Sequence, residues 1–508
     1  MDLLSIDCGV PTMRLLQLLA GGCLVIKIWR EYLVMRRVNA VARQLKRSEY
    51  NIFTYWRDFF RGIWDMRVML AERYQANPER AFVIPSMYFG PLVLIPASLD
   101  AEFRSALDSQ LSASVVQFKL IQPWHTLPDP TWGMKPTAPY RVGFNRVLNR
   151  SITTEVSTIS ADLAKLCDNV FEDSGSVMPK TSSTKNSGEW NEIKAHESMM
   201  MVATMNVSRL YVGNGLAQNK HYIKLLLQLL QAVVTCVWLV NLFPEVTKPY
   251  LFMEKNRLVE SGRKIDNEDD FVASVVATAA KIPDQRFSQL TNMSSRVVLQ
   301  HFPAIHTMGT VSHHLLEKLI AYPALADRLR KEAQDVFRNP DRPETWEADE
   351  LAQLKYHDCF IAETLRTEPL VYTTVRRSCV KKGGYTFSDE TYIPEGFDVG
   401  IPTDQVHNDA RFWGNPASFH PDRWLEREHV LPYNGSDFFA FGTGRHLCSG
   451  RFYASRAMRI ILAYTNLHYE VQEIPGQGPW HMGFSLMHAP LEKRVRVRRR
   501  CCKYSNLF

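Results

Sequence analysis

The chain has 508 residues, of which 45% are hydrophobic and 22% are charged, and its formal net charge is +7. This composition is that of a folded globular body with a large core. The modest positive charge does not indicate a nucleic-acid-binding protein, but it fits a body close to anionic lipid or an acidic redox partner. The nine cysteines include no C-x-x-C pair, which argues against a disulfide framework and favours a reducing compartment.

The first feature along the chain is a short apolar segment, Leu15–Ile26, bracketed by Arg14 and Lys27. It has no charge, but a membrane-spanning helix needs roughly twenty residues. Lys27 can snorkel to the interface and extend the apolar run to Trp29. We therefore expect a membrane anchor and basic linker over residues 1–40, with a cleaved signal peptide and a buried helix as alternatives. The arginines that follow would keep the main body, residues 41–508, in the cytosol.

A second apolar segment, Leu225–Pro244, has no charged residue and the length of a membrane span. Four polar side chains interrupt it: Gln228, Gln231, Thr235 and Asn241. Two shorter helices that pack on the body are expected, or alternatively a lid facing the membrane. The lack of further such segments argues against a transporter.

The rest of the chain predicts a mainly α protein with small β-sheets late in the sequence. Residues 173–188 read as a surface loop. Helices are expected over Met293–Leu319, Pro323–Phe337, Leu351–Thr367 and Gly450–Leu467; strands are expected over Tyr385–Phe387 and Thr391–Ile393, followed by a turn at Pro394–Gly396. Alternating Val and Arg near Arg500 predict an edge strand.

The most informative segment runs from Phe438 to Gly450 and reads FFAFGTGRHLCSG. Its glycines allow a tight loop and the close approach of a flat ligand. Cys448 directly precedes an apolar helix, whose N-terminal amides and dipole stabilise a thiolate. The bland alternative is a buried free cysteine in a turn.

The pattern Phe441-x-x-Gly444-x-His446-x-Cys448-x-Gly450 resembles the haem-binding signature of cytochromes P450, with His446 at the usual Arg position. The resemblance implies a single haem-binding domain of the P450 fold, with haem b held by the thiolate of Cys448. Arg445 and His446 would neutralise a haem propionate.

Two further motifs support this resemblance. Glu363-Thr-Leu-Arg366 resembles the E-x-x-R motif, and Arg423 lies in a run similar to the P-E-R-F region. Together these three residues imply a structural network behind the cysteine loop. Arg376 lies where relatives place a propionate ligand, with Arg377 as its alternative. A loose match suggests Tyr140, Arg141 and Arg146 for the other propionate.

The expected long helix carries Pro303-Ala304-Ile305-His306-Thr307-Met308, which resembles the oxygen-activating motif of the family. Thr307 matches the threonine that supports oxygen activation, and Ala304 matches the small residue beside the haem. His306 replaces the usual acid and is either a proton relay or a buried, hydrogen-bonded histidine. Pro303 is unusual, and we expect it to kink the helix.

The resemblance implies a monooxygenase that inserts oxygen from O2 into a hydrophobic small molecule, with electrons from an NADPH-dependent reductase. Similarity to fungal members points to a terpenoid-type intermediate of secondary metabolism, and to the endoplasmic reticulum membrane. Candidate pocket walls are Phe302, residues 371–373 (Val371, Tyr372 and Thr373) and residues 484–486. The rival interpretations are a reductase-independent haem-thiolate isomerase and a non-catalytic haem sensor.

Overall fold

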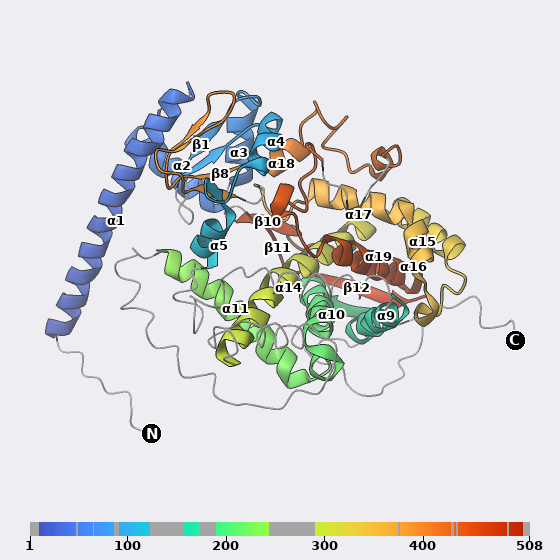
Figure 1. The fold of residues 1–508 in the computed structure, drawn as a ribbon. Coiled ribbons are helices and arrows are strands. Elements are labelled where there is room, and N and C mark those ends of the chain that lie inside the picture. Colours follow the sequence, from blue (N-terminus) through green and yellow to red (C-terminus); the bar gives the residue numbers. More distant parts are fainter. Residues whose placement is uncertain are drawn as a thin grey trace, which may run out of the picture.

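In this computed structural model the described residues are 10–46, 49–64, 66–85, 91–121, 156–172, 189–242, 290–373, 376–427, 431–432, 435–484 and 487–500. The expected surface loop at 173–188 and the candidates Tyr140, Arg141 and Arg146 lie outside these ranges. A mainly helical body carries a five-stranded sheet and three smaller ones, as predicted (Figure 1).

The helices of the N-terminal part are α1 (Val10–Gln44), α2 (Ile52–Trp64), α3 (Met66–Gln75), α4 (Asp100–Ser105), α5 (Ala113–Ile121), α9 (Val156–Glu172), α10 (Ala195–Ala217) and α11 (Lys220–Leu242). Those of the C-terminal part are α14 (Leu290–Ala321), α15 (Pro323–Val336), α16 (Ala348–Gln353), α17 (Lys355–Thr367), α18 (Thr403–His407) and α19 (Arg451–His468). Short 3-10 helices are η1 (Ala97–Leu99), η3 (Pro343–Thr345), η4 (Pro421–Trp424) and η5 (Gly444–His446).

The largest sheet has the order β1-β2-β8-β5-β3, in which only the β2–β8 pair is parallel. Its strands are β1 (Phe82–Ile84), β2 (Leu92–Leu94), β8 (Asp398–Gly400), β5 (Arg377–Cys379) and β3 (Leu111–Ser112). The others are the hairpin β6 (Tyr385–Thr386) with β7 (Tyr392–Ile393), the hairpin β10 (His481–Phe484) with β11 (Met487–Pro490), and the sheet β4 (Asn191–Lys194), β12 (Arg494–Arg499), β9 (Tyr469–Glu473).

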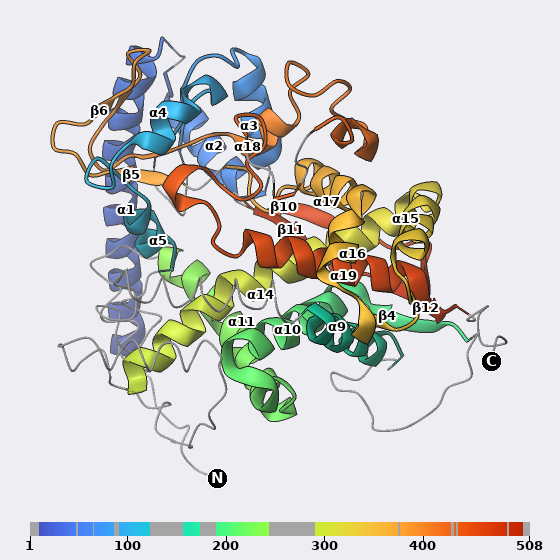
Figure 2. The same cartoon turned by 45° about the vertical axis from the view of Figure 1, so that its right-hand side comes forward.

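Helix α14 crosses the middle of the body and packs against α10, α17 and α19 (Figures 1 and 2). One hydrophobic cluster joins α9, α10, α14 and α19 to the β4-β12-β9 sheet. A second cluster lies around the five-stranded sheet and α1–α3, and a third lies between α14, α17 and α19. Helix α14 therefore lies next to α17, which carries Glu363 and Arg366, and next to α19, which follows the cysteine loop.

The structure corrects three details of the expected elements. Residues 351–367 are not one helix, because the chain leaves helical geometry at Leu354, where α16 ends and α17 begins. The alternating Val and Arg segment forms β12, which is the central strand of its sheet and not an edge, because β4 pairs with its other side. The described part of the second apolar segment, residues 225–242, does not form two helices, because α11 is continuous from Lys220 to Leu242.

The face of α11 that meets the body is defined by Ile223, Leu226 and Leu230, which are buried at helical spacing, whereas Leu225 and Leu229 are exposed. Helix α1 is amphipathic near its C-terminal end in the same way. Met35, Val38 and Val41 are buried against the β1–β2 region, so the expected boundary at residue 40 lies within a continuous helix that docks on the body.

No helix in the described ranges combines the length and the apolar character that a membrane crossing requires. The membrane-spanning helix expected near the N-terminus is thus not found there. The reason is visible in the sequence of α1, where Arg14 and Lys27 limit the charge-free run to residues 15–26.

Candidate active site

The cysteine loop joins the third hydrophobic cluster to α19. The amide of Cys448 donates to the Phe441 carbonyl (2.9 Å), and the Cys448 carbonyl accepts from the Arg451 side chain (2.9 Å). Among the cysteines whose side chains the structure describes, Cys448 is exposed, whereas Cys167, Cys359 and Cys379 are buried. Only this thiol among them is therefore placed to reach an external ligand.

The surroundings of Cys448 disfavour a free thiolate but would stabilise a thiolate that is bound to a cation. Desolvation by the surrounding protein raises the pKa of its thiol, although the side chain retains solvent contact. The amides of Gly450 and Arg451 and the guanidinium charge of Arg451 oppose this shift and lower the pKa. These donors are aimed at sulfur from the N-terminus of α19, where thiolates are stabilised, and a cation bound to sulfur would complete the effect.

Gly444 is needed for the loop to approach α4. Its φ is +61°, and a Cβ atom there would lie 2.5 Å from the Arg104 Cβ and 3.0 Å from the Arg104 carbonyl oxygen. A side chain at this position would push the loop away from α4. Phe441, half-buried, packs against the third cluster and fixes the other side of the loop.

Behind the loop, Glu363 forms a saturated, fully buried network. Arg366 donates to both of its carboxylate oxygens (2.8 Å each), and Arg423 donates to Oε1 (3.1 Å). Trp424 Nε1 donates to Oε2 (2.9 Å), and the His420 amide also donates to Oε1. Burial would raise the pKa of Glu363, but these donors hold it below its ordinary value.

Arg366 extends this network toward the cysteine loop. It donates to the carbonyl of His407 (2.7 Å), and His407 Nε2 accepts from the Phe439 amide (2.9 Å). Glu363, Arg366 and Arg423 are thus brought together as the motifs suggested. Trp424 and His407 belong to the same network, and sequence reasoning missed them; the only signal was that Trp424 directly follows Arg423.

On α14, Thr307 is exposed although its neighbours Ile305 and Met308 are buried. Its hydroxyl donates to the Pro303 carbonyl (2.7 Å), which lies one turn earlier. Ala304 is half-buried and packs against the cluster that α19 shares. An exposed threonine in the middle of a central helix faces a space that the protein does not fill, as an oxygen-binding site requires.

His306 points to a different side of α14. It is half-buried against the Phe302 ring (5.0 Å between centroids), and burial lowers its pKa, which favours the neutral imidazole. Its Nε2 is buried and has no hydrogen-bond partner within the described part of the chain. Helix α14 continues through Pro303, so the expected kink does not interrupt its helical assignment.

Arg376, just before β5, and Arg377, the first residue of β5, are the two candidates for binding a haem propionate, and their surroundings differ. Arg376 is buried, and burial lowers its pKa to about 10, opposed by Asp398. Arg377 is also buried and donates Nη1 to the carbonyls of Phe103 and Ala106 at the end of α4. Its Nε and Nη2 are buried without a hydrogen-bond partner among the described residues. A buried guanidinium with two unused donor nitrogens fits an anionic group such as a propionate, and Arg376, whose Nη1 is also buried, is a second candidate.

Arg445 and His446 are engaged with the segment after α4. Arg445 donates to the Ser105 carbonyl (3.3 Å), and His446 Nε2 lies 2.8 Å from an Asp108 carboxylate oxygen. Arg445 is exposed, and its positive charge lowers the pKa of Arg377, so the two guanidiniums are near one another. Two cations close together beside the cysteine loop suit the negative charge of a propionate better than either alone.

The residues that were expected to line the substrate pocket differ from one another in how exposed their side chains are. Val371 (41% exposed) and Met487 (46%) pair as a β-bridge on the surface of the site, and Phe302 is half-buried. Tyr372 and Thr373 are buried in the protein and do not line an open space. The side chains of residues 484–486 lie outside the described set.

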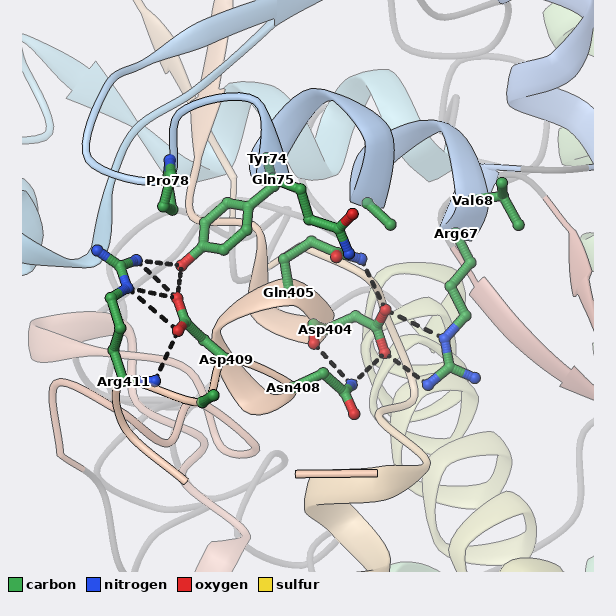
Figure 3. Close-up of a pocket in the computed structure, with 12 residues that line it drawn as sticks. Arg67, Val68, Tyr74, Gln75, Pro78, Asp404, Gln405, Asn408, Asp409 and Arg411 are labelled. Carbon is green, nitrogen blue, oxygen red and sulfur yellow. Dashed lines mark hydrogen bonds and ion pairs between the residues drawn. The ribbon is translucent and has the colours of Figure 1, made fainter. Parts of the chain in front are cut away.

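A surface groove of about 600 Å³ lies between α3 and α18, and Figure 3 shows that its charges are paired. Arg67 pairs with Asp404 (2.9 Å), and Arg411 pairs with Asp409 (2.6 Å), which also accepts from the Tyr74 hydroxyl (2.7 Å). Because neither Cys448 nor Thr307 lines it, this groove is not the haem site.

An exposed loop thiol, a saturated Glu–Arg network behind it and an exposed threonine on the central helix define a haem-thiolate protein. The model of the family Cytochrome P450 matches residues 167–495, and the chain belongs to this family. It is therefore a monooxygenase that binds haem through a cysteine thiolate. Cys448 is the cysteine at that position in the segment that resembles the haem-binding signature, residues 441–450.

The relatives are cytochrome P450 monooxygenases of fungi. Cytochrome P450 monooxygenase 151 of Postia placenta is 25% identical over 80% of this chain and 84% of its own length. Cytochrome P450 monooxygenase avaH of Aspergillus versicolor is 24% identical (82% and 92%), and atmQ of Aspergillus flavus is 23% identical (90% and 88%).

Solved structures agree with the fold. A zebra fish cytochrome P450 with abiraterone superimposes with a TM-score of 0.61 at 14% identity, covering 86% of this chain and 99% of that chain. Retinoic acid-bound cyanobacterial CYP120A1 gives 0.60 at 16% identity (84% and 93%). At these identities the likeness concerns the fold alone.

Proposed function

We propose that the protein inserts one oxygen atom from O2 into a hydrophobic small molecule, a terpenoid-type intermediate of fungal secondary metabolism, with electrons from an NADPH-dependent reductase. The observation that carries this proposal is the exposure of Thr307 on α14 together with the exposure of Cys448. Both motifs of an oxygen-activating site are present and accessible. The apolar side chains of Val371, Met487 and Phe302 suit a hydrophobic substrate.

Bound haem supplies the redox and oxygen-activating chemistry, and the chain supplies its setting. Cys448 provides the anionic ligand, stabilised by the amides at the start of α19. The Thr307 hydroxyl donates to the Pro303 carbonyl, which leaves its oxygen free to accept a hydrogen bond, and rotation about its C–O bond would let it donate one in turn. His306 is the proposed proton relay on the same helix. Burial lowers its pKa and favours the neutral imidazole, which can accept a proton at one ring nitrogen and release one from the other, and water would link it to Thr307 because the two side chains point to different sides of α14.

Basic side chains beside the cysteine loop support the proposed reductase partner. Arg104 and Arg445 are exposed on the segments that flank the loop, and Arg451 lies half-buried at the start of α19. Positive charge around the path to the haem ligand would attract an acidic electron-donating protein and raise its association rate.

The test uses the haem-loaded protein with an NADPH-dependent reductase, NADPH and ¹⁸O2, offered a panel of terpenoids. The expected product is heavier by one labelled oxygen atom and is absent without reductase or with Cys448→Ala. Product formed without NADPH and without label would establish the isomerase instead. Folded, haem-loaded protein that reduces normally and transforms no member of a broad hydrophobic panel would favour the sensor.

We also propose that the protein works at the endoplasmic reticulum membrane, with its catalytic domain in the cytosol. Large apolar side chains are exposed on α1 and α2, among them the aromatic rings of Trp29 (62%), Phe53 (82%) and Trp64 (64%). Exposed aromatic rings beside basic residues are typical of surfaces that rest in a membrane interface.

Flotation with anionic vesicles tests this location. Phe53→Ser with Trp64→Ser is expected to reduce the bound fraction severalfold, whereas Leu216→Ser, which removes an apolar side chain that is 44% exposed on α10, should leave it unchanged. Equal loss in both variants, or binding unaffected by either, would contradict a docking surface on α1 and α2.

A further inference from the structure

A buried cluster of histidines and glutamates lies away from the cysteine loop. His314 and Glu317 come from the C-terminal half of α14, and Glu368 directly follows α17. His481 on β10 pairs with Pro490 and His488 on β11 pairs with Gly483, and the two imidazole rings lie 3.9 Å apart between centroids. Four of these residues are buried, with His314 and His488 at 2% exposure or less, and His481 is partly exposed. Three segments distant in sequence, α14, the end of α17 and the β10–β11 hairpin, thus bring five potential metal ligands to one place.

The ligand atoms lie close together, at separations beyond about 3.2 Å, the long end of ordinary N–H···O hydrogen bonds. Glu317 Oε2 lies 3.7 Å from both His314 Nδ1 and His481 Nδ1. Glu368 Oε2 lies 3.7 Å from His481 Nε2 and 3.3 Å from His488 Nδ1. In each triad the ligand atoms lie within 4.8 Å of one another.

Lys318 satisfies only one oxygen of each carboxylate. Its Nζ lies 2.6 Å from Glu368 Oε1 and 3.4 Å from Glu317 Oε1. Both Oε2 atoms are buried without a hydrogen-bond partner in the part of the chain that the structure describes, and so are both ring nitrogens of His314 and the Nδ1 atoms of His481 and His488. Buried polar atoms are normally paired, so a group of them that face one another indicates a missing partner.

The missing partner is a cation. The two carboxylates of Glu317 and Glu368 face the single ammonium group of Lys318, so the carboxylates outnumber the fixed positive charges of the cluster. The nearby Arg67 does not fill this role, because its guanidinium is bound to Asp404 (Figure 3).

Ligand spacing agrees with a tetrahedral site. Nitrogen and oxygen ligands at about 2.0–2.1 Å from zinc lie about 3.3 Å from one another. In each triad two of the three separations are 3.3–3.7 Å and the third is within 4.8 Å, so side-chain shifts would bring three ligands to this spacing and leave the fourth position to water. Imidazole with carboxylate is a common ligand set for this ion.

We propose that this cluster binds one zinc-class divalent cation, with His481 as the ligand common to both possible triads. The ion would join the β10–β11 hairpin to α14 and to the end of α17. Met487 on this hairpin forms the bridge to Val371, so the site would also fix one wall of the proposed substrate pocket. This inference concerns a site outside the haem site and does not depend on the proposed activity.

The experiment measures zinc and iron in the haem-loaded protein after chelation, addition of one equivalent of Zn²⁺ and gel filtration. We expect about one zinc per haem iron, bound by nitrogen and oxygen at about 2.0–2.1 Å in zinc-edge X-ray absorption, with imidazole scattering. Zinc should also raise the Tm, because it binds only the folded state.

His481→Gln should lose the retained zinc and the zinc-dependent rise in Tm. Glu317→Gln and Glu368→Gln identify the carboxylate used, and loss in either supports the site. Two controls should retain zinc: His313→Gln, a buried histidine beside the cluster whose Nε2 faces the Trp480 carbonyl, and His221→Gln on the exposed face of α11.

Folded wild-type protein that retains no zinc would overturn the proposal, as would a zinc spectrum without imidazole. Full retention by folded His481→Gln would overturn it as well. Because the absorption spectrum is taken on the wild type, the test stands even if a variant fails to fold.

Discussion

Glu363 on α17 and Glu368 just after it are both buried, but their surroundings differ. Every oxygen of Glu363 accepts from an Arg, Trp or amide donor, whereas Glu368 uses Oε1 for Lys318 and leaves Oε2 unused within the described structure. A saturated carboxylate locks its neighbours, while one with an unused oxygen beside imidazoles retains capacity for a ligand. A buried carboxylate whose oxygens all accept hydrogen bonds therefore supports the fold, whereas a buried carboxylate with an unused oxygen can still bind a ligand.

The largest effect is expected where the saturated network is broken. Glu363→Ala leaves the buried Arg366 guanidinium without its carboxylate and should lower the free energy of unfolding by about 3–5 kcal/mol. Urea unfolding and haem retention measure this. Glu192→Ala, which removes a half-exposed partner of Arg496, is the control and should change little. A loss below about 1 kcal/mol for Glu363→Ala would show that the network does not support the fold.

A large effect on activity, but not on stability, is expected at Thr307. Thr307→Ala removes an exposed hydroxyl and should reduce product formation per haem about tenfold or more, with little change in Tm. Thr307→Ser keeps the hydroxyl and should restore most of the rate. Unchanged turnover in Thr307→Ala would remove this residue from the proton path.

The pH dependence of stability should reflect buried neutral histidines. Burial lowers the pKa of His407 to about 3, whereas its pKa in the unfolded chain is about 6.5. Between pH 6.5 and pH 3, roughly, His407 is therefore protonated in the unfolded chain but neutral in the folded protein. Stability is then lost as pH falls below about 6.5, by at most about 1.4 kcal/mol per pH unit for this group. His407→Gln should flatten the change in unfolding free energy between pH 7 and 5. An unchanged slope would mean that His407 is charged in the folded state.

The smallest effect is expected on the surface of β12. Arg496 lies 3.4 Å from Glu192, and both side chains are about half exposed. Arg496→Ala should cost no more than about 0.5 kcal/mol, because water and salt screen such pairs. The Tm values of Arg496→Ala and Arg366→Ala are measured side by side. Arg366 is 0% exposed, so the two variants compare the loss of the same charged group from the surface and from the interior. Equal losses would contradict the role given to burial.

Short sequence patterns predicted the helices and those parts of the site whose residues lie close together in the chain. The motifs placed Glu363 beside Arg366, since both lie on one helix face, and placed Cys448 at the start of α19. The periodicity over residues 351–367 could not show the break at Leu354, because α16 and α17 both continue the apolar pattern. The central position of β12 depends on β4, which is contributed by residues 191–194 and leaves no signal at residues 494–499.

Contacts between distant segments were not accessible in the same way. Arg376 was preferred over Arg377 by spacing, whereas the buried, unused N–H groups of Arg377 depend on where α4 ends. His314, His481 and His488 were not singled out, because they have no regular spacing and meet only when the β10–β11 hairpin packs on α14. Side-chain burial, which decides both cases, is a property of the fold and not of any short motif.

The most direct test of the haem-thiolate site is the absorption spectrum of the dithionite-reduced protein under carbon monoxide, beside Cys448→Ala. We predict a Soret band strongly red-shifted from that of histidine-ligated haem, and its loss in the variant, because the thiolate of Cys448 donates electron density to the iron. A band at the histidine-ligated position in the wild type, or a red-shifted band that persists in Cys448→Ala, would contradict the assignment of Cys448 as the iron ligand.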